Sequence, residues 1–320
     1  MIGTMAKRPR VAVLDDYLGV APSLAPWDGL DADVTFFGAP LGDGDAVADG
    51  LEPFDVVCAM RERTSLPATV LERLPNLRLL VTTGMQNAAI AIAAAKSRGV
   101  TVSGTGGVPE ATVELTWALI LAAVRHVAEH DRGMREGRWQ RDLGGDLAGR
   151  RLGVLGLGTN GSRVAAIGQA FGMDVVAWSA NLTAAVARDH GATRVEREEL
   201  LATSDVVTIH LRLGDRTRGL IGAAELGRMK RDAVLVNTSR GPIVDEQALI
   251  DALRDGQIRA AALDVYDEEP LPADSPLRSL DNIVLSPHVG YVSGANMRRF
   301  YEETVEDIRA WQAGRPIRAL

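Results

Sequence analysis

Short runs of β-branched and aliphatic residues alternate with helical patterns along nearly the whole chain. The first runs are VAVLD (11–15), VTFF (34–37), VVCAM (56–60), LRLLVTT (77–83) and VTVSGT (100–105). This alternation is typical of βαβ units, in which helices cover both faces of a parallel sheet. The predicted fold class is therefore α/β, with this first series forming one compact unit.

A second series of strand runs forms another α/β unit. It begins with RLGVLGLG and continues through DVVAWS, VVTIHL, AVLVNTS, AALDVY and NIVLSPH. A single long helical pattern, from about Ala111 to Gly137, separates the two series and follows the helix-start signal Pro109. A last amphipathic pattern, about 294–313, follows the second series. If this helix packs on the first unit, that domain is discontinuous.

Composition narrows the classes of partner. The net charge is −7 and 46% of residues are hydrophobic, so we expect no nucleic-acid or membrane partner. The one cysteine, Cys58, cannot form an internal disulfide, which fits a reducing compartment. The longest apolar run (115–124) is too short to span a bilayer, and the N-terminus lacks a signal-peptide pattern. We expect a cytoplasmic protein.

The segment GVLGLGTNG contains a G-x-G-x-x-G pattern formed by Gly156, Gly158 and Gly161. It follows an apolar strand run and precedes a helical pattern, which is the context of a dinucleotide-binding turn. The three glycines permit a tight turn, close approach of a pyrophosphate and close helix–sheet packing. The N–H groups of Thr159 and Asn160 would then face the phosphates from the helix N-terminus.

The residue that usually selects between NAD and NADP departs from the common pattern. An acidic residue is expected about 20 residues after the glycine turn, at the end of the second strand. Ser179 stands there, and no arginine lies beside it in the sequence. The sequence therefore leaves NAD and NADP both open as the cofactor, and we expect no metal.

An arginine, a carboxylate and a histidine follow later strand runs of the second unit. They are Arg240 in NTSRGP, Glu269 in DEEP and His288 in SPHVGY. Taken singly, each has a structural alternative: a helix cap, a solvated acidic loop or a structural histidine. Ligands of a doubly wound sheet bind at the carboxyl ends of its strands, where all three fall. Together they suit hydride transfer at a carbonyl, since a guanidinium binds a carboxylate and a histidine paired with a carboxylate donates a proton.

Four longer segments, three of which contain the residues just named, follow the glycine turn in order: SDVVTIHLRLGDRTRGLIG, LVNTSRGPIVDEQAL, AALDVYDEEPL and LSPHVGY. With the glycine turn, they resemble the D-isomer-specific 2-hydroxyacid dehydrogenases over nearly the whole length. The resemblance implies a Rossmann cofactor domain of residues 106–289. It also implies a discontinuous, flavodoxin-like substrate domain of residues 1–105 and 290–320, with substrate bound between the two.

The resemblance also implies roles for individual residues. Arg240 falls on the substrate arginine, Glu269 on the catalytic glutamate and His288 on the proton-relay histidine. Asp264 falls on the residue that holds the nicotinamide carboxamide. Cofactor contacts are implied at Gly156, Gly158, Thr159, Asn160, Gly161, Ser179, His210, Thr217, Thr238, Asp264 and Gly290. Substrate contacts are implied at Arg61 and Arg240, and through the backbone N–H groups of Gly84, Met85, Gln86 and Asn87. For Arg61 the alternative is a surface arginine without a substrate contact.

The predicted activity is hydride transfer between NAD(P) and a D-2-hydroxy acid / 2-keto acid pair, similar to glyoxylate or hydroxypyruvate reductases. The expected partners are a small carboxylic acid and a second copy of the chain in a homodimer, paired through the helix near 111–130. One alternative is a dinucleotide-sensing, corepressor-like binding protein without turnover. Formate or phosphite oxidation is another, although Glu269 argues against formate. Ala91 stands where the family commonly has an aspartate, which bears on the geometry of the substrate loop.

Overall fold

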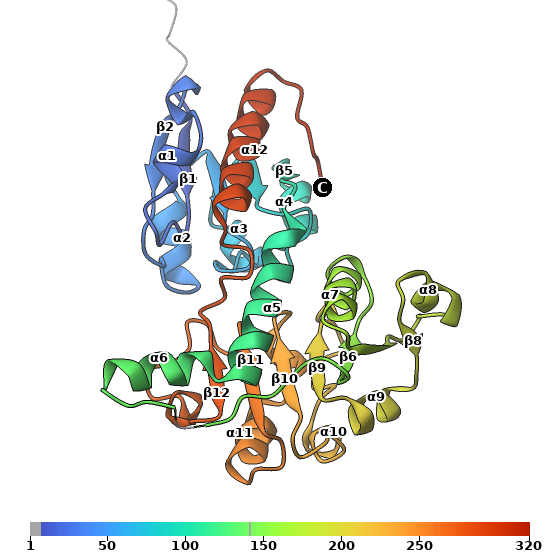
Figure 1. The fold of residues 1–320 in the computed structure, drawn as a ribbon. Coiled ribbons are helices and arrows are strands. Elements are labelled where there is room, and N and C mark those ends of the chain that lie inside the picture. Colours follow the sequence, from blue (N-terminus) through green and yellow to red (C-terminus); the bar gives the residue numbers. More distant parts are fainter. Residues whose placement is uncertain (1–7, 141) are drawn as a thin grey trace, which may run out of the picture. The chain divides into compact units, whose positions relative to one another are not determined.

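Each of the two units of the chain is built on one fully parallel sheet (Figure 1). The computed structural model describes residues 8–140 and 142–320. Unit 1 comprises Met1–Val108 and Val292–Leu320, and unit 2 comprises Pro109–Tyr291. The strands expected from the sequence are present, with bounds shifted by up to three residues, and the short strand β8 is additional, so the predicted α/β fold class is confirmed.

The sheet of unit 1 has five strands in the order β2-β1-β3-β4-β5, the flavodoxin-like order. Its central strands are buried along their whole length because helices cover both faces. The strands are β1 (Arg10–Val13), β2 (Asp33–Phe36), β3 (Val56–Ala59), β4 (Leu79–Thr82) and β5 (Thr101–Gly104). The helices are α1 (Ala21–Leu24), α2 (Asp45–Leu51), α3 (Ala68–Leu71), α4 (Ile92–Ser97) and α12 (Gly294–Gln312).

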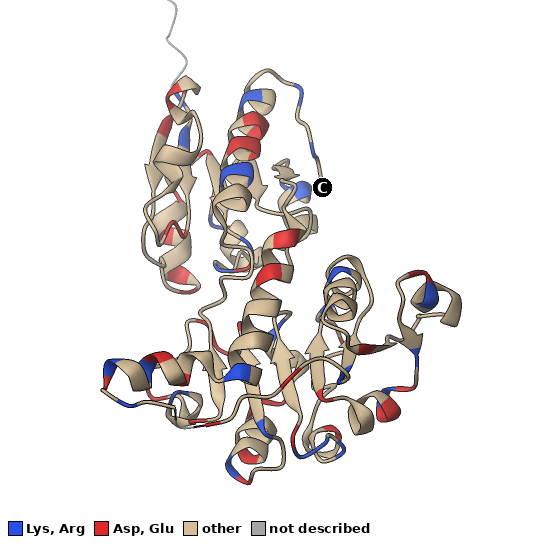
Figure 2. Cartoon of the chain, viewed as in Figure 1, with Lys and Arg blue, Asp and Glu red and all other residues tan. Residues whose placement is uncertain are grey.

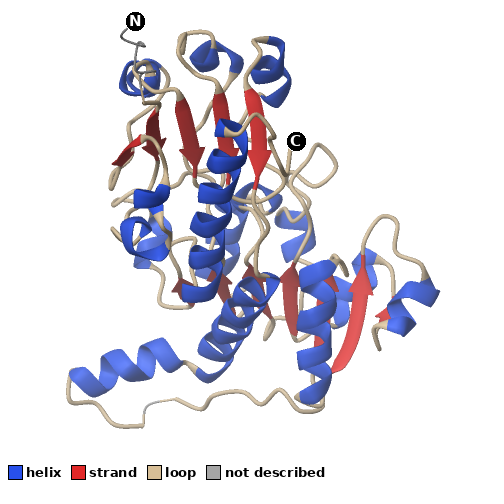
Figure 3. Ribbon diagram, turned by 90° about the horizontal axis from the view of Figure 1, so that it is seen from above, coloured by secondary structure: helices blue, strands red, loops and turns tan. Residues whose placement is uncertain are grey.

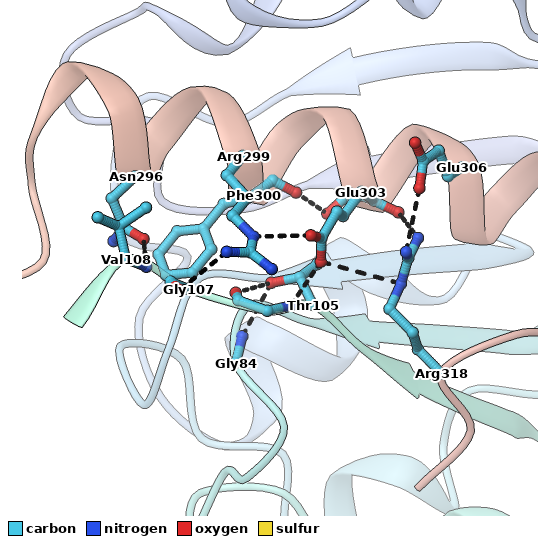
Figure 4. A network of polar contacts seen from close by, with 12 residues as sticks. Gly84, Thr105, Gly107, Val108, Asn296, Arg299, Phe300, Glu303, Glu306 and Arg318 are labelled. Carbon is cyan, nitrogen blue, oxygen red and sulfur yellow. Dashed lines mark hydrogen bonds and ion pairs between the residues drawn. The ribbon is translucent and has the colours of Figure 1, made fainter. Parts of the chain in front are cut away.

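Helix α12 belongs to unit 1 although it follows all of unit 2 in the sequence. One face of α12 holds the segment that leaves β5 (Figure 4). The Gly106 N–H donates to Glu303 Oε2 at 2.5 Å, and the Val108 N–H donates to Asn296 Oδ1 at 2.7 Å. The last residues of unit 1 before unit 2 begins are therefore fixed by side chains from the far end of the sequence.

Arg318 fastens the C-terminal segment to the same helix (Figure 4). Its guanidinium donates to Asp307 Oδ1 and Glu306 Oε2, each at 3.0 Å, and to the Glu303 carbonyl at 2.8 Å. Its own carbonyl accepts the Gly104 N–H at 3.0 Å. Acidic and basic residues are interspersed along α12 (Figure 2), which supplies these pairs.

The sheet of unit 2 has seven strands in the order β12-β11-β10-β9-β6-β7-β8, the Rossmann order with one added strand. The strands are β6 (Arg151–Leu155), β7 (Asp174–Trp178), β8 (Thr193–Arg194), β9 (Val206–Ile209), β10 (Val234–Asn237), β11 (Ala260–Leu263) and β12 (Ile283–Leu285). The helices are α5 (Pro109–Arg125), α6 (Val127–Arg135), α7 (Thr159–Ala170), α8 (Ala184–Asp189), α9 (Arg197–Thr203), α10 (Ala223–Leu226) and α11 (Glu246–Arg254).

The single long helix predicted from Ala111 to Gly137 is wrong: the structure has two helices, α5 and α6, bent by 64°. The break is at His126, whose φ of 53° is left-handed and interrupts the helical hydrogen-bond ladder. Figure 3 shows α6 extending from the end of α5 beyond the sheet of unit 2. Within residues 8–140 and 142–320, no single helix has the length and apolar character needed to cross a membrane.

Candidate active site

The glycine turn of unit 2 adopts a conformation that only glycine permits at two of its positions. Gly156 directly follows β6 and has a φ of 99°. A β-carbon on Gly161 would lie 1.9 Å from the Gly156 carbonyl oxygen, so α7 packs directly on the turn. A β-carbon on Gly158, by contrast, would meet nothing within 4 Å.

Helix α7 begins at Thr159, immediately after Gly158. The N-cap residue is Gly158, which has no side chain, so its side chain makes no capping hydrogen bond to this end of the helix. The first N–H groups of a helix have no partner within it, and they favour an anion. The open space at Gly158 and this uncapped end fit the pyrophosphate of a dinucleotide.

Ser179 follows β7, beside the glycine turn, where the Gly156 N–H donates to the Trp178 carbonyl at 2.8 Å. The Ser179 carbonyl accepts the Leu182 N–H at 3.0 Å and so shapes the turn after β7. Arg194, on β8, donates to the Leu182 carbonyl and to Glu196. No carboxylate stands at Ser179 to oppose a 2′-phosphate, so NAD and NADP both stay open.

His210, at the end of β9, contacts the glycine turn through its backbone. A β-carbon on Gly156 would lie 2.7 Å from the His210 carbonyl oxygen. Burial lowers the pKa of His210 to about 4, so its imidazole is neutral at physiological pH. Its Nε2 lies 2.9 Å from the Thr208 hydroxyl. His210 thus borders the glycine turn through its backbone, while its side chain bonds within unit 2.

Two threonines assigned to the cofactor from the sequence already have partners within the protein. The Thr217 hydroxyl donates to the Arg212 carbonyl at 2.6 Å and shapes the loop after β9. The Thr238 hydroxyl is buried and lies 2.9 Å from the hydroxyl of Thr116 on α5. Their cofactor contacts stay predictions, and the structure shows a packing role for each.

Glu269 and His288 form a direct pair. Nδ1 of His288 lies 2.5 Å from Oε2 of Glu269. The second carboxylate oxygen, Oε1, accepts the Tyr266 N–H at 2.9 Å, which fixes the orientation of the carboxylate. His288 itself has a left-handed φ of 52°, an uncommon conformation for a residue with a side chain. Glu269 thus engages the imidazole through Nδ1.

The loop that carries His288 is held by Asp264, at the end of β11. Its Oδ1 accepts the Ser286 hydroxyl at 2.7 Å and the Val289 N–H at 2.9 Å, and its Oδ2 accepts the Gly290 N–H at 2.8 Å. Burial raises the pKa of Asp264, and these hydrogen bonds act against that rise. The sequence assigned Asp264 to the nicotinamide carboxamide. The structure adds a positioning role that the sequence did not reveal, because Ser286 and Val289 are near Asp264 only in the folded sheet.

Arg240 lies between β10 and the short 3-10 helix Gly241–Ile243. Its Nη1 donates to the Ser239 carbonyl at 2.7 Å, and its own carbonyl accepts from the Asn237 side chain at 2.9 Å. A β-carbon on Gly241 would lie 2.1 Å from the Tyr266 carbonyl. The loop of Arg240 therefore packs against the segment that orients Glu269, and the three predicted residues share one rim of unit 2.

Unit 1 brings Arg61 onto the segment TTGMQN. The Arg61 Nη1 donates to the Thr83 carbonyl at 3.3 Å, and a β-carbon on Gly84 would lie 2.1 Å from that nitrogen. The Asn87 side chain donates to the Arg61 carbonyl at 2.6 Å. The Gly84 N–H donates to the Thr105 hydroxyl at 3.0 Å, so it is already committed within unit 1. Met85, Gln86 and Asn87 stay as the backbone donors proposed for a substrate carboxylate.

Comparison with known proteins identifies the family of the chain. Residues 117–290 match the family model described as "D-isomer specific 2-hydroxyacid dehydrogenase, NAD binding domain". The chain belongs to this family. It is therefore an NAD(P)-dependent oxidoreductase of the 2-hydroxyacid dehydrogenase type, as the motifs predicted.

Individual relatives have related names. The chain is 43% identical to a glyoxylate reductase of Aeropyrum pernix over 256 residues, which cover 77% of this chain and 76% of the relative. It is 29% identical to a hydroxypyruvate reductase of Blautia hydrogenotrophica, covering 97% of this chain and 99% of the relative. A crystal structure of a phosphoglycerate oxidoreductase from Vibrio cholerae superposes with a TM-score of 0.89 at 36% identity, covering 96% of this chain and 99% of the other.

Proposed function

We propose that the chain interconverts a small 2-keto acid and its D-2-hydroxy acid, with Arg240, Glu269 and His288 as its catalytic residues. The observation that carries this assignment is the 2.5 Å contact between His288 Nδ1 and Glu269 Oε2. A histidine held this way by a carboxylate is suited to give a proton to a carbonyl oxygen, or to take one from a hydroxyl.

Each residue has its own part in the reaction. In the reductive direction, the Arg240 guanidinium binds the substrate carboxylate and polarises the neighbouring carbonyl. His288 protonates the carbonyl oxygen through Nε2, and Glu269 stabilises the imidazolium and keeps it in place. The nicotinamide cofactor, when bound, supplies the hydride. The oxidation of the D-2-hydroxy acid uses the same groups in reverse.

The two units have different parts in this proposal. Unit 2 holds the dinucleotide at the glycine turn, with Asp264 fixing the loop of His288. For unit 1, the family resemblance implies substrate contacts at Arg61 and along the Met85–Asn87 backbone. The similarity to a glyoxylate reductase and a hydroxypyruvate reductase supports a small 2-keto acid as the substrate class.

The test is steady-state kinetics with a panel of 2-keto acids, each with NADH and with NADPH. We expect turnover by the wild type, and a loss of about 10²- to 10⁴-fold in kcat for His288→Ala. Near-normal turnover by His288→Ala would contradict the proton-transfer role. Dinucleotide binding without turnover of any acid in the panel would favour the corepressor-like alternative.

A matched substitution addresses cofactor choice. Ser179→Asp places a carboxylate where the ribose 2′-hydroxyl binds, and it would repel a 2′-phosphate. We expect kcat/KM with NADPH to fall by about tenfold or more relative to that with NADH. An unchanged NADH to NADPH ratio would show that Ser179 does not lie at the ribose.

We also propose that the chain forms a homodimer through α6 and the segment after it. Trp139 and Leu143 are 73% and 96% exposed, and Val127 and Met134 on α6 are exposed as well. A hollow of about 270 Å³ lies between α6 and β12, lined in part by His126 and Ile283. Exposed apolar groups beside a hollow favour a protein partner. Light scattering on the wild type and on Trp139→Ala measures the oligomeric state and tests this proposal.

The expected cytoplasmic location stays a prediction.

A further inference from the structure

Three neighbouring strands of unit 1 end in the same unusual way. Asp15, Arg61 and Gly84 each lie two residues beyond the end of β1, β3 and β4, and their φ angles are 59°, 51° and 91°. These strands are adjacent in the sheet order β1-β3-β4. Left-handed φ angles at residues with side chains are strained, and they persist where surrounding contacts enforce them. The carboxyl edge of the unit 1 sheet is thus a tightly determined rim.

The contacts at Asp15 hold one aromatic side chain, Tyr17, in place. The Tyr17 hydroxyl donates to Asp15 Oδ1 at 3.0 Å, and the Thr64 hydroxyl donates to Asp15 Oδ2 at 2.8 Å. The Arg63 guanidinium lies 4.5 Å from the centre of the Tyr17 ring and donates to the Asp15 carbonyl at 3.0 Å. The ring is therefore held by its hydroxyl and stacked against a guanidinium that is itself anchored.

Tyr17 stays exposed despite these contacts. It is 41% exposed, its neighbour Leu18 is 64% exposed, and Met85 is 45% exposed. Most other large apolar side chains of unit 1 are buried in its core. An aromatic ring held in one orientation but left uncovered loses little conformational entropy when a ligand packs on it. Met85 differs from the fixed Tyr17 ring, because its flexible side chain can adapt to the shape of a ligand.

The loop of Arg61 to Thr64 connects these groups. At one end Arg61 lies over Gly84, in the segment proposed to bind the substrate carboxylate. At the other end Arg63 and Thr64 hold Asp15 and Tyr17. One short loop therefore joins the proposed carboxylate segment to the Tyr17 ring, since Arg61 contacts Thr83 and Arg63 contacts Tyr17. Strands β1 and β4 are two positions apart in the sheet, about 10 Å, a span that a long substrate side chain covers and glyoxylate does not.

We propose that Tyr17, with Leu18 and Met85, forms a subsite for the substrate side chain, and that this subsite selects 2-keto acids with a long apolar or aromatic side chain. The inference rests on the proposed function, and it names the substrate class for that same site. Arg63 acts as a positioning residue, because it holds the Tyr17 ring. Glyoxylate has no side chain, and hydroxypyruvate has only a short polar one, so neither uses the subsite.

The experiment measures kcat/KM for phenylpyruvate, 4-methyl-2-oxopentanoate, hydroxypyruvate and glyoxylate with the intact chain. We expect the wild type to favour phenylpyruvate over glyoxylate by about tenfold or more, the range that apolar pocket contacts supply. Tyr17→Ala should lower the phenylpyruvate to glyoxylate ratio by about tenfold, mainly through KM. Tyr17→Phe keeps the ring and should retain most of the preference. Val186→Ala removes an exposed apolar side chain from unit 2 and serves as the control.

The outcomes separate the two proposals. Turnover of glyoxylate in preference to phenylpyruvate, or a ratio unmoved by both Tyr17→Ala and Leu18→Ala, overturns the subsite and leaves the proposed function intact. Turnover of none of the four acids by wild type overturns the proposed function, and the subsite falls with it. Thermal melting of each variant distinguishes a lost contact from a lost fold, and Leu18→Ala, at a highly exposed position, serves as the second variant.

Discussion

Glu269 places one carboxylate oxygen 2.5 Å from Nδ1 of His288 while the other accepts the Tyr266 N–H at 2.9 Å. Both oxygens of the carboxylate are thus engaged, and each by a fixed partner. The imidazole is oriented by the carboxylate, and the carboxylate is oriented by the backbone.

The first prediction concerns this pair. Glu269→Gln keeps the size of the side chain but removes the charge that stabilises a protonated His288. We expect kcat for 2-keto acid reduction to fall by about 10²-fold, with a smaller change in KM. Glu268→Gln changes the neighbouring exposed acid and should keep wild-type kinetics. Equal losses in both variants would mean that the loss comes from loop charge rather than from the His288 contact.

A second prediction distinguishes shape from charge at Arg240. Arg240→Lys keeps the positive charge but loses the planar fork that pairs with a carboxylate. We expect kcat/KM to drop by about 10²-fold, because a bidentate contact and carbonyl polarisation are both lost. Arg231→Lys, at an exposed position of unit 2, is the control. Wild-type kcat/KM in Arg240→Lys would show that only the charge matters.

The third prediction compares two glycines of one turn. Gly161→Ala forces a β-carbon to within 1.9 Å of the Gly156 carbonyl, so α7 must shift and the melting temperature should fall by several degrees. Gly158→Ala meets nothing within 4 Å at a φ of −86°, so the fold should be unaffected. We expect Gly158→Ala to weaken dinucleotide binding nonetheless, since its new methyl group occupies space that the pyrophosphate needs. Calorimetry with NADH and NADPH, beside thermal melting, measures both effects.

A fourth prediction concerns pH and the buried Asp307 of α12. Burial raises the pKa of Asp307 from 3.8 to about 7, against the opposing effect of Arg318, while Glu303 and Glu306 raise it further. The folded chain therefore binds this proton more tightly than the unfolded chain. The stabilisation is complete below about pH 4 and is lost as the pH rises toward 7, at up to about 1.4 kcal/mol per pH unit.

Asp307→Asn should remove this part of the pH dependence. Urea unfolding at pH 4.5 and pH 7.5 measures the free energy of unfolding, and the variant should lose less stability between the two values than the wild type. The neighbouring thiol Cys58, whose pKa burial raises, stays neutral across this range and does not contribute. Glu302→Gln changes an exposed acid on the same helix that does not act on Asp307, and it should keep the wild-type slope. Parallel slopes for wild type and Asp307→Asn would contradict the prediction.

The sequence predicted the strands well because parallel strands are buried on both faces, and their apolar runs are short and bounded. It predicted one helix where there are two, since a left-handed His126 leaves no periodicity signal and the residues on both sides favour helix.

The proposed catalytic residues Arg240, Glu269 and His288 follow strands β10, β11 and β12 within recognisable segments, so the sequence could single them out as candidates. What the sequence could not predict are the partners that orient them. Ser286 reaches Asp264 across 22 residues of chain because β11 and β12 pair in the sheet, and no spacing in the sequence indicates it. The Tyr17–Arg63 stack likewise joins loops after β1 and β3, which lie more than 40 residues apart.

The discontinuity of unit 1 has a consequence for how the polypeptide is made. A ribosome delivers residues 1–108 first, then all of unit 2, and only afterwards the helix and Arg318 that hold Gly104 and Gly106. Unit 2 is continuous, so it can fold while the chain still grows. Strands β1–β5 of unit 1 are synthesised before α12, so the apolar surface that α12 covers stays exposed until that helix has been made. Nascent chains halted before residue 292 should therefore engage holding chaperones through unit 1 rather than unit 2.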